Sequence, residues 1–140
     1  MRAATAKTIG VGLLTGLLLN VTGWLGNNFL LGSMWRQLQV TDAGAAWRAT
    51  IWRDVFSFAP DFVYGVAIAW LCIALRPRFE HWQSSALTAG LFVAITGGVV
   101  TYFGIANSGF IGWPLAFASF GLVLATKLPL ALLAGRLLEP

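Results

Sequence analysis

The stretch HWQSSALTAGLFVAITGGVVTYFGIANSGFIGWPLAFASFGLVLAT, residues 81–126, contains no aspartate, glutamate, lysine or arginine. A helix that crosses a bilayer needs roughly 20 mostly apolar residues, so this stretch is long enough to cross twice. The polar turn Asn107-Ser-Gly lies between the two crossings. Because that turn is short, we expect antiparallel neighbouring helices over about residues 83–106 and 110–137.

Two shorter charge-free stretches precede this one. They predict the first two spans, over about residues 8–34 and 59–76. The second span reaches membrane-crossing length only if Pro60 begins its helix, Asp61 lies at the outer end and Arg76 extends toward the headgroups. The sequence therefore predicts an all-α membrane protein, a four-transmembrane-helix bundle that forms a single domain over residues 1–140.

The overall composition agrees with membrane insertion. The chain is 58% apolar and 10% charged over 140 residues, whereas soluble domains are about 25% charged. Four spans of this length leave no room for a separate soluble domain. The net charge of +4 is what basic residues flanking apolar spans produce. We therefore expect the lipid bilayer, and not nucleic acid, to surround or bind this chain.

The segment between the first two spans predicts an amphipathic helix over about residues 43–58. At 100° per residue its apolar and polar side chains separate onto two faces, so it should lie in the membrane interface. Tryptophan is favoured at the headgroup level, and basic side chains anchor span ends. The predicted interfacial anchors are Trp47, Trp52, Arg76 and Arg78.

The basic residues also predict an orientation. With a cytoplasmic N-terminus, the cytoplasmic side carries more of them than the outer side does. The inner set is Arg2, Lys7, Arg76, Arg78 and Arg136, and the outer set is Arg36, Arg48 and Arg53. Both termini are therefore predicted to be cytoplasmic.

Small residues recur at helical spacing in two spans. The third span carries one at every fourth position, namely Ala86, Gly90, Ala94 and Gly98. The first span carries Gly12 and Gly16 in the same way. Such a face lets another helix backbone approach closely in lipid. It serves either helix packing within the bundle or docking of a partner subunit or second copy.

Two polar residues fall inside the spans and form a candidate polar site. An amide at the depth of Asn20 and an ammonium at the depth of Lys127 are costly in lipid unless they are partnered. Lys127 precedes Arg136 closely enough for its stem to snorkel inward, and we expect that; a ligand or ion site is the alternative. Asp61 is expected in the outer half of the membrane, away from Lys127. Asn27, near the outer interface, needs no special account.

The residues needed for enzymatic chemistry are missing. Cys72 is the single cysteine and His81 the single histidine, and the spans contain no paired carboxylates and no phosphate-binding loop. We therefore expect no catalytic site, no metal site and no cofactor. A role for His81 as one axial ligand to a pigment or haem shared with a partner is left open.

The stretch Asp61-Phe-Val-Tyr-Gly-Val-Ala-Ile-Ala-Trp-Leu, followed by Leu75-Arg-Pro-Arg-Phe79, resembles a segment of small bacterial four-span membrane proteins of unknown function. The resemblance implies a bacterial inner-membrane protein and implies no activity. Small multidrug exporters have a similar size, but they carry a glutamate in the first span that this chain lacks. Four-span quinone reductases of the vitamin K type need paired cysteines, which are missing as well.

We therefore expect a non-catalytic integral membrane protein, an accessory or assembly subunit of a larger membrane complex. Its small-residue faces would pack against other subunits or a second copy. The alternative is a small oligomeric transporter or channel with a polar site around Asn20 and Lys127.

Overall fold

The computed structural model describes residues 2–37 and 51–139, with side chains described within 5–37 and 58–139. These residues are helical apart from short turns and contain no strand. Four helices are long and apolar enough to cross a membrane: Thr5–Leu30, Phe58–Arg78, Trp82–Asn107 and Trp113–Leu137. The prediction of an all-helical chain with four membrane-compatible spans is thus confirmed.

The first span changes helix type near its end. Helix α1 (Arg2–Leu25) continues into the π-helical segment η1 (Gly26–Leu30), and the short helix α2 (Gly32–Arg36) follows. Asn27 joins these parts, since its amide nitrogen donates to the Gly23 carbonyl at 2.9 Å. Its amide oxygen accepts a hydrogen bond from the Trp35 indole at 3.1 Å. This bond holds α2 against η1.

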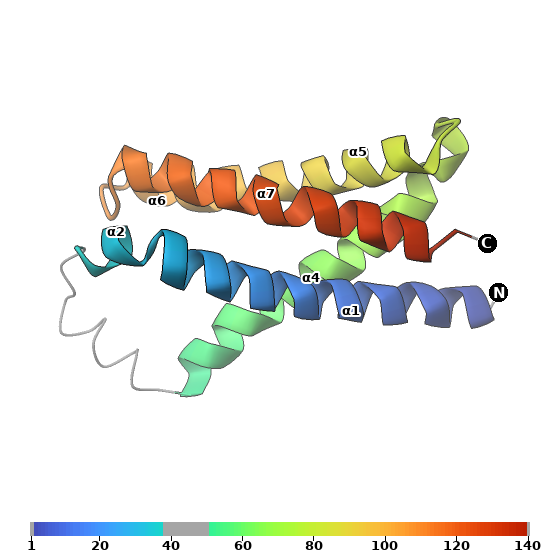
Figure 1. Ribbon diagram of the computed structural model, residues 1–140, viewed down its shortest axis with the longest axis horizontal. Coiled ribbons are helices and arrows are strands. Elements are labelled where there is room, and N and C mark those ends of the chain that lie inside the picture. Colours follow the sequence, from blue (N-terminus) through green and yellow to red (C-terminus); the bar gives the residue numbers. More distant parts are fainter. Residues whose placement is uncertain (1, 38–50, 140) are drawn as a thin grey trace.

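The second span belongs to a longer helix than the sequence predicts. Helix α4 (Ile51–Leu75) runs through Pro60 without a break and crosses α1 diagonally (Figure 1). The last residues of the predicted interfacial helix, 43–58, are therefore the beginning of α4. The rest of that prediction, with Trp47, lies outside the described residues, and so does the side chain of Trp52.

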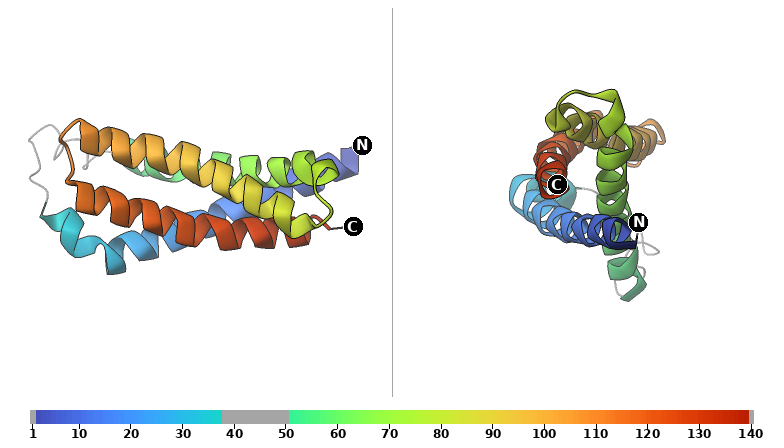
Figure 2. Two further views of the ribbon diagram at one scale, coloured as in Figure 1. Left: turned by 90° about the horizontal axis from the view of Figure 1, so that it is seen from above. Right: turned by 90° about the vertical axis from the view of Figure 1, so that its right-hand side faces the viewer.

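The third and fourth spans lie side by side (Figure 2). After the 3-10 turn η2 (Arg76–Arg78), the third span is built from α5 (Trp82–Ala94), the π-helical segment η3 (Ile95–Phe103) and α6 (Gly104–Asn107). These three segments form one continuous helix. The fourth span is α7 (Trp113–Leu137).

A glycine makes the turn between these two spans possible. Gly109 has a φ of 79°, in the left-handed region that side chains with a Cβ disfavour. Its N–H donates to the Ala106 carbonyl at 3.0 Å, and the Phe110 N–H donates to the Ile105 carbonyl at 3.2 Å. These hydrogen bonds end α6. Glycine in the left-handed conformation commonly ends helices in this way. The chain then reverses into α7.

Both chain ends lie at the same end of the molecule (Figures 1 and 2). Lys7 Nζ donates to the Glu139 carbonyl at 3.0 Å, and Arg76 donates to the Leu138 carbonyl at 3.3 Å. The start of α1, the end of α4 and the end of α7 are thus tied together. Because the chain runs along the molecule four times, its two ends lie at the same end of the molecule.

Helices α1 and α4 touch through their backbones. A Cβ added to Gly65 would lie 2.3 Å from both the Gly12 carbonyl oxygen and the Gly16 nitrogen. A Cβ on Gly12 would lie 2.6 Å from the Val66 Cα. No side chain fits at these distances, so the predicted small-residue face of the first span is occupied by α4.

The small residues of the third span pack against α7 in the same manner. All four are buried: Ala86, Gly90, Ala94 and Gly98. A Cβ on Gly90 would lie 2.6 Å from the Ala131 Cβ, and one on Gly98 would lie 2.8 Å from the Phe120 ring. The ladder therefore lies inside the chain and does not offer an exposed docking face.

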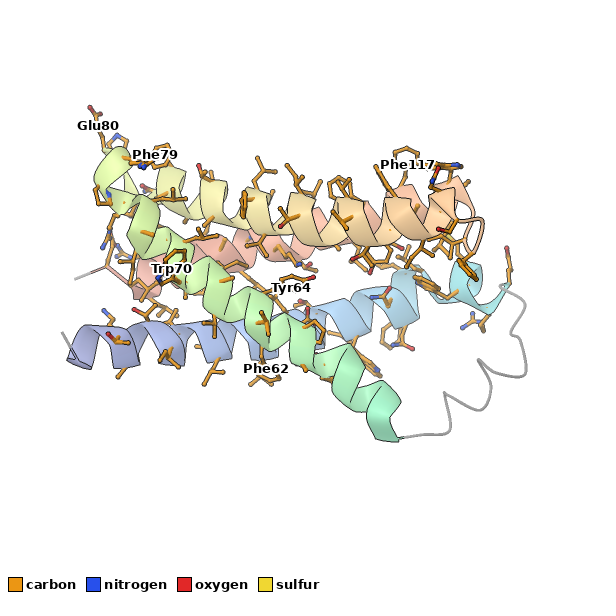
Figure 3. The ribbon with its side chains drawn as sticks, turned by 180° about the vertical axis from the view of Figure 1, so that it is seen from behind. Phe62, Tyr64, Trp70, Phe79, Glu80 and Phe117 are labelled. Carbon is orange, nitrogen blue, oxygen red and sulfur yellow. The ribbon has the colours of Figure 1, made fainter. Side chains whose placement is uncertain are left out.

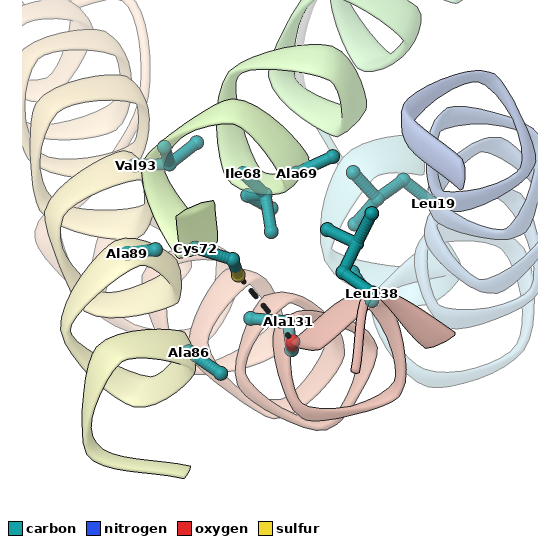
Figure 4. Packing of buried hydrophobic residues seen from close by; sticks show 10 residues of the cluster. Leu19, Ile68, Ala69, Cys72, Ala86, Ala89, Val93, Ala131 and Leu138 are labelled. Atoms are coloured by element: carbon teal, nitrogen blue, oxygen red, sulfur yellow. Dashed lines mark hydrogen bonds between the residues drawn. The ribbon is translucent and has the colours of Figure 1, made fainter. Parts of the chain in front are cut away.

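Small side chains dominate the main buried cluster (Figure 4). The Cys72 thiol lies 3.9 Å from the Ala131 carbonyl, which it approaches as a weak donor. Because alanine occupies so many of these positions, the helix backbones pack at short distances. The cluster contains Leu19, Ile68, Ala69, Cys72, Ala86, Ala89, Val93, Ala131, Ala134 and Leu138.

We predict that Gly65→Ala destabilises the protein by about 1–3 kcal/mol, because the new methyl overlaps the α1 backbone. Gly10→Ala is the matched control, since nothing lies within 4 Å of the methyl position there. It should leave stability unchanged or raise it by up to about 1 kcal/mol, as alanine favours helix over glycine. Thermal unfolding in detergent measures both, and equal midpoints would contradict the α1–α4 backbone contact.

Candidate functional site

Lys127 lies inside the protein and does not snorkel. Its side chain is 5% exposed, and its ammonium nitrogen lies 3.6 Å from the centre of the Tyr64 ring. A cation over an aromatic face is an attractive contact that replaces part of the lost hydration. Tyr64 reaches this position from α4 (Figure 3). The expectation that Lys127 extends to the inner surface is therefore wrong.

The ammonium borders a cavity of about 320 Å³ lined by residues of α1, η1, α4, η3 and α7. Its walls combine apolar side chains with a set of polar ones that is unusual at membrane depth. The polar lining residues are Asn27, Asp61, Tyr64, Thr101, Tyr102, Ser119, Thr126 and Lys127.

Asp61 shares this cavity with Lys127, contrary to the sequence-based expectation. That expectation placed Asp61 at the outer end of its span. The structure places its backbone beside the middle of the first span, since a Cβ on Gly16 would lie 2.9 Å from the Asp61 carbonyl oxygen. The reason is that α4 begins at Ile51 and is tilted, so Asp61 lies well inside the helix.

The two charges are neighbours without forming an ion pair. Within the described residues, neither the Asp61 carboxylate nor the Lys127 ammonium makes a hydrogen bond or salt bridge to another protein group. The ammonium has three donors and the carboxylate about four acceptor sites. Both groups therefore retain hydrogen-bonding capacity toward the cavity.

Ser119 adds a neutral group to the same wall. Its side chain is 1% exposed, and its hydroxyl oxygen is the one buried side-chain polar atom in the described part of the chain without a hydrogen-bond partner. Leaving a buried hydroxyl unpaired costs about 1–3 kcal/mol. A polar guest in the cavity would remove that cost.

Both π-helical segments contribute to the cavity. Asn27 comes from η1, and Thr101 and Tyr102 come from η3. π-helical turns within α-helices occur frequently at functional sites. The sequence gives no periodic signal for such turns, so it does not predict that Thr101 and Tyr102 line a site. Asn27 is not predicted there because its depth places it near the outer interface.

Gly97 makes room for the stacked pair. A Cβ at this position would lie 3.0 Å from the Tyr64 ring carbon and hydroxyl, and 3.3 Å from Lys127 Nζ. These distances are shorter than ordinary van der Waals contact, so a larger residue would displace the ammonium or the ring. The absence of a side chain at Gly97 thereby leaves room for Lys127 over the Tyr64 ring.

The structure does not bring the predicted partner Asn20 to Lys127. The Asn20 amide donates to the Gly16 carbonyl at 3.1 Å and to the Phe58 carbonyl at 3.2 Å. It lines a separate groove of α1 and α4 and is not among the residues that line the polar cavity. Its role is to join two helices, and the amide that lines the cavity with Lys127 is that of Asn27.

The remaining predicted site residues lie at the ends of the helices. Arg76 bonds to the C-terminal segment, and Arg78 is exposed in η2. His81 is exposed and directly precedes α5. Among the described residues, no group of three or more histidine, cysteine or acidic side chains is placed to hold a metal ion.

The chain matches no protein-family model, no curated protein and no solved structure. The geometry of the cavity is therefore the basis on which a function can be proposed.

We predict that Asp61→Asn/Lys127→Met raises the free energy of unfolding by about 1–4 kcal/mol, because it removes two desolvated charges that lack hydrogen bonds. Arg36→Met/Glu80→Gln removes one positive and one negative charge at exposed positions and should change it by less than about 0.5 kcal/mol. Denaturant or thermal unfolding in detergent measures the difference. A loss of stability in the first variant would indicate that the cavity charges stabilise each other.

Proposed function

We propose that this chain is a small transporter whose solute site is the polar cavity between α1, α4, η3 and α7. The observation that carries this proposal is the burial of Lys127 in a cavity that also contains Asp61. Ionisable residues within spans are costly and typically mark substrate or ion pathways. The sequence also allows a small transporter with a polar site around Asn20 and Lys127. We keep that hypothesis, but the site that we propose contains Asn27 and Asp61 and not Asn20.

The position of the cavity supports movement of a solute. It lies between the α1–α4 contact and the α5–α7 contact, each of which is held by closely packed small residues. Two such pairs can rock against each other as units, which is how many transporters expose a central site alternately to the two sides. Lys127 and Asp61 lie on different pairs, so the motion would change the distance between them.

We also propose a bacterial inner membrane, with both termini cytoplasmic, as the setting. The end of the molecule that holds both termini also carries Lys7, Arg76, Arg78 and Arg136, whereas Arg36 lies at the opposite end (Figure 1). This bias agrees with the positive-inside rule. The resemblance to small bacterial four-span proteins supports the choice of membrane.

The second candidate function is that of a non-catalytic accessory subunit. It is favoured by an apolar groove of about 610 Å³ on the surface of α1 and α4, where Trp24, Phe58 and Phe62 form the walls. The small-residue ladder of the third span no longer supports it, because α7 covers that face. A helix of another subunit, a second copy of this chain or lipid chains would fill such a groove in the bilayer.

We predict that a cysteine at Thr101 reacts with a small hydrophilic methanethiosulfonate reagent, in a chain whose native cysteine is replaced by Cys72→Ala. Thr101 is exposed and lines the cavity, so water reaching the cavity would keep part of its thiol ionised and reactive. Val100→Cys is the matched control, because the adjacent Val100 side chain is 73% exposed and lies outside the cavity lining. A thiol facing hydrocarbon stays protonated and should react slowly.

Labelling of reconstituted protein, with reagent on either side of the membrane, measures this difference. Equal rates at the two positions would contradict a water-accessible site. Adding Lys127→Leu to the Thr101→Cys chain should slow the reaction, because the cavity loses a charge that retains water.

Native mass spectrometry of the gently solubilised protein separates the two functions. The transporter predicts a homo-oligomer or monomer without a stoichiometric foreign subunit. A stable complex with a different membrane protein at fixed stoichiometry would favour the accessory function instead.

A further inference from the structure

We infer that the cavity takes a small zwitterion, with its anionic group toward Lys127 and its cationic group toward Asp61. This inference rests on the proposed function and names its class of substrate. Both side chains line the same cavity. Three properties of the cavity indicate this class of ligand: the chemistry of its walls, its charge balance and its size.

The first step concerns hydrogen bonding. Within the described residues, Lys127 has one strong contact, to the Tyr64 ring, and Asp61 has no hydrogen-bond or ion-pair partner. An anionic group would accept from the ammonium, and a cationic group would donate to the carboxylate. A ligand that carries both groups can therefore bind both Lys127 and Asp61.

The second step concerns net charge. One ammonium and one carboxylate leave the cavity neutral overall, and low-polarity surroundings make any uncompensated charge expensive. A simple anion or cation would pair with one wall group and leave the other unpaired, with net charge added to the interior. A zwitterion adds no net charge, so the cavity remains neutral when it is occupied.

The third step concerns size and the remaining wall. At about 30 Å³ per water molecule, a cavity of 320 Å³ holds about ten. A small amino acid therefore fits together with several water molecules. Ser119, with its buried and unpartnered hydroxyl, supplies a neutral hydrogen-bonding group beside the two charges. One face of Tyr64 is already covered by Lys127, so the ligand's cationic group has the carboxylate, and not that ring face, as its partner.

The experiment measures binding of matched probes to the full chain in lipid nanodiscs by isothermal titration calorimetry. The zwitterions are glycine, β-alanine and 4-aminobutyrate, and the singly charged controls of similar size are propionate and propylammonium. We expect at least one zwitterion to bind at least about tenfold more tightly than either control. Propionate or propylammonium binding as tightly as every zwitterion, or no zwitterion binding at all, would overturn the inference.

Variants that remove one charge test the assignment through the ligand preference. Unfolding would weaken binding of all ligands and would not reverse the preference. Asp61→Asn should shift preference toward propionate, and Lys127→Gln should shift it toward propylammonium, each by about tenfold. The exposed variants Lys7→Met and Glu80→Gln should leave preference unchanged. Unchanged preference in both cavity variants would overturn the assignment of the two wall groups.

The two proposals fail in different ways. If Thr101→Cys is labelled faster than Val100→Cys but no zwitterion is preferred, the cavity is open to water and only the substrate class is wrong. If the two cysteines also react equally, the transporter proposal fails with it.

Discussion

The backbone contact between α1 and α4 sets how the first two long helices cross, and with it the place of Asp61. Glycine at positions 12, 16 and 65 removes the side chains that would hold these helices apart. At that distance van der Waals packing between backbones drives association in lipid, where the hydrophobic effect between helices is absent. The crossing also sets the path of α4. Because α4 passes α1 diagonally, Asp61 lies beside the middle of the first span and not at its end.

The polar cavity is a consequence of that crossing together with the π-helical segments. Helices that cross diagonally separate away from their contact point, and the space between them is lined by whichever side chains face inward. In η1 and η3 the wider helix turns Asn27, Thr101 and Tyr102 toward that space. Gly97 then leaves room for Lys127 over the Tyr64 ring. Polar groups from four segments that are separate in the sequence, η1, α4, η3 and α7, line one cavity.

Stability and proposed function place opposite demands on this region. The buried clusters elsewhere use alanine and leucine, which pack densely and carry no polar atoms. A lysine and an aspartate without hydrogen-bonded partners lower stability in the same interior. The rest of the fold offsets this cost through close helix packing and through the bonds from Lys7 and Arg76 to the C-terminal segment.

The sequence by itself determined the four helices that are long and apolar enough to cross a membrane, because the length of each charge-free stretch and the cost of burying charge in lipid are local properties. It also identified Lys127 as the charge inside a span, and the glycines and alanines as packing residues. Only the tertiary structure decided which helix each small face meets, and that Lys127 is buried beside Tyr64 instead of reaching the surface. It alone brought Asp61 and Asn27 to Lys127 and separated Asn20 from it. The physical reason is that depth along a straight helix can be counted from sequence, whereas helix tilt, π-helical turns and the facing of side chains depend on contacts between segments far apart in the chain.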